Sequence, residues 1–297
     1  MEKLNTEVLL SVSKTGSFRK TAELLGYTQA GISYIINSIE EDTGLILFSR
    51  DRAGVRLTPE GEALLPYIQK MEILDRQFHQ AVDDLKGLRK GSVRVLIFNS
   101  ISIHWIPGIL RRFLTDYPGI TVELISEEDS VHAEEMLLNG EADCAFFLTS
   151  VHSNLEVFPL MEENLMAVVS LDHPLADCKV FPVSELGNYP YIGMKYDEHT
   201  GISNIFHRHG ITPNPVFLMD NDNAAISMAS NGLGYCIFAE LVLQNIPYNV
   251  KCLKFDEPQK RTISISTRSM NSCSKACQKF IEYTMHWVKE NVKSSLL

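Results

Sequence analysis

SFRKTAELLGYTQAGISYIINSIEEDTGLILFSRDRAGVRLTPEG, residues 17–61, is the most informative stretch of the 297-residue chain. Ser17 is a favourable N-cap, because its hydroxyl can accept a hydrogen bond from an unpaired backbone N–H in the first helical turn. Apolar residues follow at helical spacing, at Phe18, Ala22 and Leu25. Gly26 permits a positive φ, and Thr28 is the next N-cap. The pattern predicts two helices joined by a turn of about two residues.

The second helix should carry Ile32, Ile36 and Ile39 on one face and end near Gly44. A short apolar strand at 45–48, a turn at 51–54 and a return strand at 55–57 then predict a hairpin. The basic residues of this hairpin, or wing, are Arg50, Arg52 and Arg56. A tight turn between two helices is the spacing at which the second helix can enter a DNA major groove.

Residues 1–61 resemble the DNA-binding domain of LysR-type transcriptional regulators. The matching positions are Gly16-Ser17-Phe18, Ala22, Gln29, Ser33, Ile39-Glu40, Gly44, Leu47-Phe48 and Leu57-Thr58-Pro59-Glu60-Gly61. The resemblance implies that the second helix faces the groove while residues around it bind phosphates. The candidate DNA-binding residues are Ser17, Arg19, Lys20, Thr28, Gln29, Ala30, Ser33, Tyr34, Asn37, Arg50, Arg52 and Arg56.

The second helix departs from the family pattern. Members usually have a proline where this chain has Ala30, and often a basic residue where it has Tyr34; no charged side chain occurs between residues 28 and 38. Base recognition must therefore use neutral groups. Gln29 is suited to a bidentate contact with adenine, and Asn37 or Tyr34 to single hydrogen bonds. Ile35 could contact a thymine methyl group, or it could pack on a dimer partner or on the wing.

The net charge of −10, from 27 Lys and Arg against 37 Asp and Glu, disfavours binding to phosphate. The charge is unevenly distributed, because residues 1–90 hold 12 basic and 13 acidic side chains and the remainder holds 15 and 24. The N-terminal part is thus nearly neutral. Affinity for DNA should depend on a few placed cations, on backbone amides at helix starts and on several copies binding together.

Thr58 and Pro59 begin a helix expected to reach Leu88, about 30 residues and roughly 45 Å long at 1.5 Å per residue. Its apolar residues recur at nearly heptad spacing, at Leu64, Ile68, Met71, Leu74, Phe78, Ala81, Leu85 and Leu88. An ordinary core helix is one interpretation. The length favours a dimerising linker helix, which the resemblance also implies, and a two-fold dimer would suit an inverted-repeat site.

Beyond a break at 89–92, apolar strands alternate with amphipathic helices, which predicts an α/β fold with parallel sheets. The resemblance implies a periplasmic-binding-protein-like domain of two α/β subdomains. We therefore expect a winged helix-turn-helix domain at 1–58, with the helix-turn-helix at about 18–37, and a dimerising linker helix at 59–88. The effector-binding domain should span 91–297, with subdomain I at about 91–163 and 269–297 and subdomain II at about 164–268.

Ligands of open α/β sheets bind at the carboxyl ends of strands. The candidate effector-binding residues at such ends are Ser100, Ile101, Ser102, Glu128, Asp129, Leu148, Thr149, Asp197, Thr200 and Ser203. Helix starts with hydroxyls favour a carboxylate ligand. The acidic run 127–129 favours a neutral or cationic one, unless those side chains are only solvated.

Six cysteines, Cys144, Cys178, Cys236, Cys252, Cys273 and Cys277, are interpreted as buried reduced thiols. Cys273 and Cys277 are expected to share a helical face. We expect no metal site, cofactor or catalytic residue, since the sequence has no zinc-helix motif, phosphate-binding glycine loop or nucleophile elbow. The sequence also has no signal-peptide core and no apolar run of membrane-spanning length.

These features predict a cytoplasmic LysR-type regulator that binds an inverted-repeat promoter as a homotetramer, a dimer of dimers, and responds to a small-molecule effector. RNA polymerase is a further expected partner. The alternative is a small-molecule-binding α/β protein or enzyme whose N-terminal helices serve only protein interaction.

Overall fold

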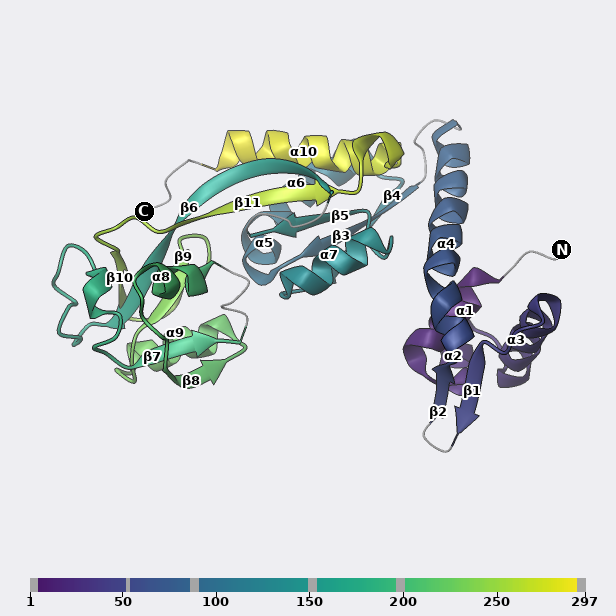
Figure 1. Cartoon of the computed structure of the whole chain (residues 1–297). Coiled ribbons are helices and arrows are strands. Elements are labelled where there is room, and N and C mark those ends of the chain that lie inside the picture. Colours follow the sequence, from purple (N-terminus) through teal and green to yellow (C-terminus); the bar gives the residue numbers. More distant parts are fainter. Residues whose placement is uncertain (1–4, 52–53, 86–90, 149–153, 196–200, 293–297) are drawn as a thin grey trace. The chain divides into compact units, whose positions relative to one another are not determined.

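A computed structural model describes residues 5–51, 54–85, 91–148, 154–195 and 201–292. Contacts within the chain divide it into two compact units, Met1–Val82 and Asp83–Leu297 (Figure 1).

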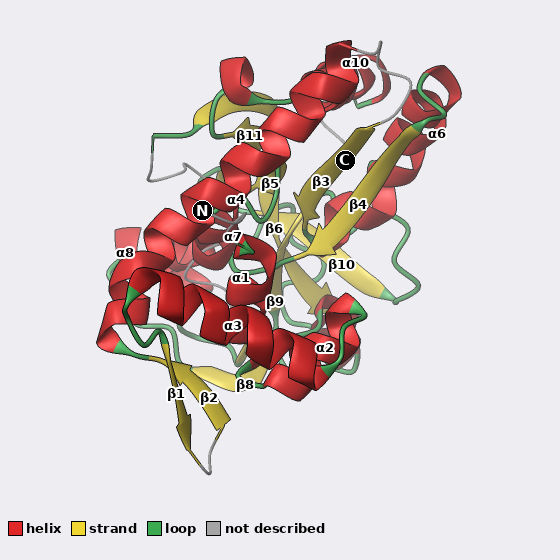
Figure 2. Cartoon of the chain, turned by 90° about the vertical axis from the view of Figure 1, so that its right-hand side faces the viewer, coloured by secondary structure: helices red, strands yellow, loops and turns green. Residues whose placement is uncertain are grey.

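The first unit is a winged helix-turn-helix. Its elements are α1 (Thr6–Thr15), α2 (Phe18–Leu25), α3 (Gln29–Thr43), β1 (Phe48–Asp51) and β2 (Gly54–Leu57), followed by the first part of α4 (Pro59–Leu85). Figure 2 shows the antiparallel hairpin β1–β2 projecting beside α3. Val8, Val12, Ile32 and Ile36 are fully buried at the centre of the unit. The apolar residues whose spacing predicted α2 and α3 therefore form the buried face of each helix.

The expected helix caps are present. The Ser17 hydroxyl accepts a hydrogen bond from Lys20 N at 3.3 Å, and the Thr28 hydroxyl accepts one from Gly31 N at 3.0 Å. Gly26 and Gly44 have φ of 71° and 69° and end α2 and α3 in the left-handed conformation. Local sequence signals thus set both ends of α3, the candidate recognition helix.

The first wing strand begins later than the sequence predicts. Leu45 and Ile46 are exposed, and β1 starts at Phe48. The cause is the Glu40 carboxylate, whose Oε1 accepts hydrogen bonds from the backbone N–H of Leu47 at 2.7 Å and of Phe48 at 3.0 Å. This carboxylate ties the chain after α3 to the end of that helix, which leaves residues 45 and 46 outside the hairpin.

The start of α4 packs closely against residues 46 and 47, which precede the wing strand β1. Thr58 Oγ1 accepts from Gly61 N at 3.0 Å, as expected for an N-cap, and donates to Ile46 O at 2.6 Å. A Cβ atom at Gly61 would lie 2.3 Å from the backbone oxygen of Leu47. The glycine is therefore required here by the close approach of two backbones.

The apolar stripe of α4 divides into two faces. Leu64 and Ile68 pack on the core of the first unit. A second stripe, the α4 stripe, is exposed and comprises Tyr67, Met71, Leu74 and Phe78. Tyr67 was missing from the predicted seam. The side chains of the predicted seam residues Ala81 and Leu85, and the whole of Leu88, lie outside the described residues.

The second unit is built on a mixed sheet. Its strands are β3 (Gly91–Ile97), β4 (Ile120–Ser126), β5 (Cys144–Phe147), β6 (Glu156–Ser170), β7 (Tyr191–Met194), β8 (Pro215–Met219), β9 (Cys236–Ala239), β10 (Val250–Lys254) and β11 (Lys260–Thr267). Its α-helices are α5 (Asn99–His104), α6 (Ile106–Asp116), α7 (Ser130–Leu138), α8 (Ile202–Arg208), α9 (Asp222–Ser230) and α10 (Lys275–Asn291), with 3-10 turns at Val183–Glu185 and Met270–Ser272.

The main sheet has the order β10-β6-β11-β5-β3-β4, with β9 also paired to β6, and β7 and β8 form a separate parallel pair. The expectation of parallel sheets holds for only some of the strands. β3 is parallel to β4 and β5, but β11 is antiparallel to β5 and β6, and β6 is antiparallel to β9 and β10. The returning strand β11 therefore runs against β3, β4 and β5, whereas the long strand β6, antiparallel to β11, runs in the same direction as they do.

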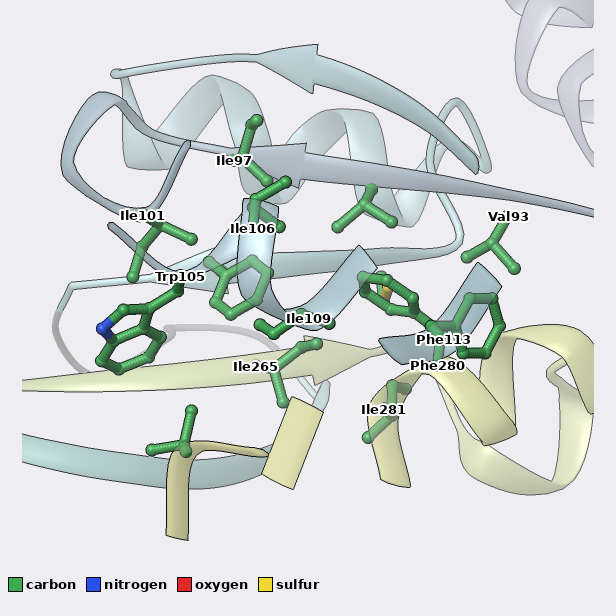
Figure 3. Close-up of a cluster of buried hydrophobic side chains, with 14 of the residues drawn as sticks. Val93, Ile97, Ile101, Trp105, Ile106, Ile109, Phe113, Ile265, Phe280 and Ile281 are labelled. Atoms are coloured by element: carbon green, nitrogen blue, oxygen red, sulfur yellow. The ribbon is translucent and has the colours of Figure 1, made fainter. Parts of the chain in front are cut away.

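Different parts of β6 enter different cores. Met161 belongs to the core that α6 and α10 cover, where Trp105, Phe113 and Phe280 are buried (Figure 3). Further along, Leu165 and Val169 face a second core while Met166 faces a third, as expected from the alternation of side chains along a strand. Side chains of this one strand therefore contribute to three separate cores.

α5 and α6 are two separate helices that meet at the buried Trp105.

Two expectations about the cysteines were wrong. Cys273 and Cys277 do not share a helical face, since α10 begins only at Lys275 after the N-cap Ser274. All six cysteines are free thiols, and Cys178 is exposed rather than buried.

Candidate DNA interface and effector cleft

Most of the predicted DNA-binding residues are exposed on the first unit. Those that are exposed are Arg19, Lys20, Thr28, Gln29, Ala30, Tyr34, Asn37, Arg50 and Arg56, whereas Ser17 and Ser33 are half-buried. Arg52 lies outside the described residues. Tyr34 is 75% exposed, so its side chain is accessible to a partner.

Arg50 connects the wing to the recognition helix. Its Nη2 donates to Asn37 Oδ1 at 2.8 Å, its Nη1 lies 3.5 Å from Ser33 Oγ, and its guanidinium carbon lies 4.6 Å from the centre of the Phe18 ring. The 2.8 Å contact is a good hydrogen bond and the 3.5 Å contact a weak one. The sequence did not indicate that this wing arginine holds two of the candidate base-contacting side chains.

Ile35 packs inside the first unit. It is half-buried against a core that includes Phe48 of the wing strand. Of the alternatives open from sequence, packing on the wing agrees with this position. Arg19 is exposed and lies 3.9 Å from Glu23, a surface pair that leaves the guanidinium accessible to a phosphate.

Two adjoining cavities lie in the second unit, lined by residues of α5, α8 and α9 and of the strands β7, β9 and β11. The inner cavity, of about 60 Å³, is lined by Ser100, Glu128, Leu148, Asp222, Arg261 and apolar side chains. The outer cavity, of about 370 Å³, shares Ser100, Asp222 and Val242 with it. Together they form the cleft.

The predicted effector residues are not all in this cleft. Ser100, Glu128 and Leu148 line the inner cavity. Ile101 is buried in the α6–α10 core, Asp129 caps α7 by accepting from Val131 N, and Ser102 donates to Asn99 O. Ser203 is half-buried in α8. Thr149, Asp197 and Thr200 lie outside the described residues.

The cleft also contains charged residues that the sequence did not reveal. Asp222 begins α9, and Arg261 projects from β11 with Nε 2.8 Å from Glu163 Oε1 on β6. The Arg261–Glu163 pair is almost fully buried, with side chains 6% and 1% exposed. Because these residues come from separate segments, only the folded chain brings them to Ser100 and Glu128.

Burial is the main cause that raises the pKa of the Glu128 carboxyl; the hydrogen bond from Asn99 N opposes the rise, and the charge of Asp222 adds to it. Burial likewise raises the pKa of Asp222, against the effects of Asn99 and Arg261. Asn99 contacts both carboxylates, with its N–H 2.8 Å from Glu128 Oε1 and its Nδ2 3.5 Å from Asp222 Oδ2. The cleft therefore holds two carboxylates that burial makes harder to ionise.

A winged helix-turn-helix joined to an α/β domain with an internal cleft defines a class of DNA-binding proteins that carry a ligand-binding domain. The model for bacterial regulatory helix-turn-helix proteins of the LysR family matches residues 5–62, and the LysR substrate binding domain matches residues 86–289. The chain belongs to the LysR family of DNA-binding transcriptional regulators.

The chain is similar to the uncharacterized HTH-type transcriptional regulator YvbU of Bacillus subtilis, with 27% identity over 93% of this chain and 95% of that protein. Its fold is similar to full-length OxyR of Pseudomonas aeruginosa, at a TM-score of 0.74 and 17% identity over 97% of this chain and 95% of that one. It is also similar to CbnR complexed with its target DNA, at a TM-score of 0.65 and 20% identity over 97% and 100% of the two chains.

Within the described ranges, no helix is both long enough and apolar enough to span a membrane. In the same part of the chain, no group of three or more His, Cys, Asp or Glu side chains is placed to hold a metal ion.

Proposed function

We propose that this regulator binds an inverted-repeat promoter site as a dimer of dimers and that a small molecule in the cleft changes the arrangement of the tetramer. The observation that carries the DNA part is the exposed surface of α3, where Gln29, Tyr34 and Asn37 present hydrogen-bonding groups to solvent. CbnR, a protein of similar fold, is known in complex with its target DNA.

On this surface, Gln29 contacts an adenine edge, and Asn37 and Tyr34 make single hydrogen bonds to bases. Thr28, Ala30 and Ser33 belong to the same DNA-binding surface. Ser17, Arg19, Lys20, Arg52 and Arg56 bind phosphates, which position the protein without reading sequence. Arg50 binds phosphate and also positions Asn37 through its hydrogen bond to the Asn37 side chain.

The α4 stripe supports two-fold dimerisation through the linker helix. Leu74 and Phe78 are 63% and 65% exposed, and Tyr67 and Met71 extend the stripe at spacings of four and three residues. A long helix that exposes apolar residues at this spacing buries them against an identical helix. The dimer then presents two copies of α3 to two half-sites.

A second self-association surface in the effector unit would convert dimers into a tetramer. β8 pairs only with β7 among the described strands, and Val216, Phe217 and Leu218 on it are 53%, 40% and 56% exposed. An edge strand that exposes consecutive apolar side chains is a surface that proteins normally cover. β4, also an edge strand, exposes Leu124.

The effector occupies the cleft. The domains that we propose are 1–58 for DNA binding, 59–88 for dimerisation and 91–297 for effector binding, with subdomain II at about 164–268. β6 and β11 connect the subdomains, so a ligand with different affinity for two subdomain arrangements shifts their populations. Contact with RNA polymerase and a cytoplasmic location complete the proposal and follow from regulation of transcription.

Selection from a pool of random duplexes by the full chain tests the DNA part. The expected enriched sequence is an inverted repeat with half-sites about one helical turn apart or a multiple of it. The mass of the complex, measured by light scattering, should correspond to four chains.

Enrichment of no sequence, or of a site without two-fold symmetry, would contradict the proposal. A complex of one chain per duplex would contradict the dimer of dimers and leave sequence recognition standing.

A further inference from the structure

The cleft contains two polar groups that the protein itself leaves unsatisfied. Arg261 Nη2 and Ser100 Oγ are buried and have no hydrogen-bond partner among the described residues. Arg261 is 8% exposed and Ser100 4%, and both line the inner cavity. A buried unsatisfied polar group costs about 1–3 kcal/mol, and more when it is charged. A ligand that supplies an acceptor here removes that cost.

Other residues that line the same cavity have the opposite chemistry. Glu128 and Asp222 are hydrogen-bond acceptors, and Asn99 contacts both. Arg261, the one cation among the described residues that line the inner cavity, already forms an ion pair with Glu163. Three carboxylates therefore face one guanidinium, and an anion alone would add negative charge to an excess of it.

From this arrangement we infer that the effector is a small zwitterion, an α-amino acid, whose ammonium group lies between Glu128 and Asp222 and whose carboxylate binds Arg261 Nη2 and Ser100 Oγ. The inference rests on the proposed function, because it names the ligand class of the same cleft. It also explains the buried ion pair: Glu163 fixes the Arg261 guanidinium from one side and leaves Nη2 for the ligand carboxylate.

The outer cavity indicates the kind of side chain. It is lined by the amides of Asn99, Asn223, Gln244 and Asn245 and by His104. These groups can donate and accept hydrogen bonds, and apolar residues such as Ile103 and Val242 complete the wall. An amino acid bound with its charged groups in the inner cavity directs a polar side chain toward these amides.

Calorimetry with the full chain tests the inference. The probes are the twenty protein amino acids, each compared with the amine left when its carboxylate is removed and the acid left when its ammonium group is removed. We expect at least one polar amino acid to bind about tenfold to a hundredfold more tightly than its matched amine and acid. Equal binding of a matched amine or acid, or no binding of any amino acid, would overturn the inference.

Charge variants provide a second readout for the amino acid that binds. Asp222→Asn should weaken its binding about tenfold or more and improve binding of the matched acid. Ser100→Ala should weaken binding of the amino acid and of the matched acid by the same factor, and should leave binding of the matched amine unchanged. Arg261→Gln combined with Glu163→Gln removes the ion pair without leaving a lone buried charge, and should abolish the preference for a carboxylate. An unchanged preference in all three variants would contradict the assignment of the two ends.

The outcomes separate this inference from the proposed function. If a polyol or a simple acid binds in the cleft and changes DNA binding, the zwitterion is wrong and the proposed function stands. If an amino acid binds with the expected charge dependence and leaves DNA binding unchanged, the ligand class is right and the proposed coupling is wrong.

Discussion

Arg50 Nη2 on the wing donates to Asn37 Oδ1 on the recognition helix at 2.8 Å. The contact means that a candidate phosphate-binding residue and a candidate base-contacting residue are not independent. The hydrogen bond holds Asn37 in one rotamer before DNA arrives, so loss of Arg50 should affect base recognition as well as affinity.

Arg50→Ala should therefore lower affinity for the selected duplex more than for a scrambled duplex of the same length. Its effect should also be non-additive with Asn37→Ala, because the two residues share one hydrogen bond. Fluorescence anisotropy on both duplexes measures these affinities. Arg56→Ala is the control. It should lower the affinity for both duplexes by the same factor and reduce the salt dependence of binding by about one counterion. Equal losses on both duplexes for Arg50→Ala would show that Arg50 binds phosphate only.

Gly61→Ala should destabilise the DNA-binding unit, because the added Cβ would lie 2.3 Å from Leu47 O. Overpacking of this kind costs about 1–3 kcal/mol, or roughly 4–8 °C in melting temperature per kcal/mol for a unit of this size. Differential scanning calorimetry of the full chain measures the change. Gly187→Ala is matched to it, since there the Cβ would meet Ile211 at an ordinary 3.9 Å. An unchanged first-unit transition in Gly61→Ala would refute the close backbone contact.

Leu74→Glu should dissociate the dimer, because it places a charge within the α4 stripe. Light scattering should show a halved mass at a given concentration. DNA affinity should fall by about 10²–10⁴, the usual contribution of two linked sites. His79→Glu changes an exposed residue on another side of the same helix and should preserve the mass. Full-size particles with Leu74→Glu would exclude this stripe as the interface.

Asp222→Asn should stabilise the ligand-free protein at pH 7. A carboxyl whose pKa is raised on folding binds its proton more tightly in the native state, so its contribution to stability is present at low pH and is lost as the pH rises through the raised pKa. The melting temperature of Asp222→Asn should exceed that of wild type at pH 7 by a few degrees, about 2–4 °C per kcal/mol, and the gap should narrow toward pH 5.

Asp220→Asn is the control for this pH dependence. The hydrogen bond from Lys195 lowers the pKa of the exposed Asp220, so its contribution is present above the ordinary carboxyl pKa and lost as the pH falls. This variant should not be more stable than wild type at pH 7. The same rise in both variants would mean that burial of Asp222 is not the cause.

Most of the first unit could be predicted from sequence because its elements depend on neighbouring residues. Features that depend on contacts between distant residues could not be predicted. Gly26 and Thr28 act on their own neighbours, so the turn and the start of α3 could be predicted. The start of β1 could not, because it depends on Glu40 reaching Leu47 and Phe48 across the end of α3.

The cleft shows the same limit. Ser100 and Glu128 follow strands and could be placed by the general rule for α/β sheets. Asp222 and Arg261 lie far along the chain from them and from each other, and nothing in their local sequence indicates a cavity. The antiparallel direction of β11 brings Arg261 to Glu163 and to the cleft, and a repeating pattern of strands and helices does not reveal that direction.

The most direct test of sequence-specific recognition through α3 is the ratio of affinities of the full chain for the selected duplex and for a scrambled duplex at one salt concentration. We predict a ratio of about 10³ or more for wild type, and a loss of about tenfold in that ratio for Gln29→Ala with no change on the scrambled duplex. A wild-type ratio near one, or an equal loss on both duplexes for Gln29→Ala, would contradict the account.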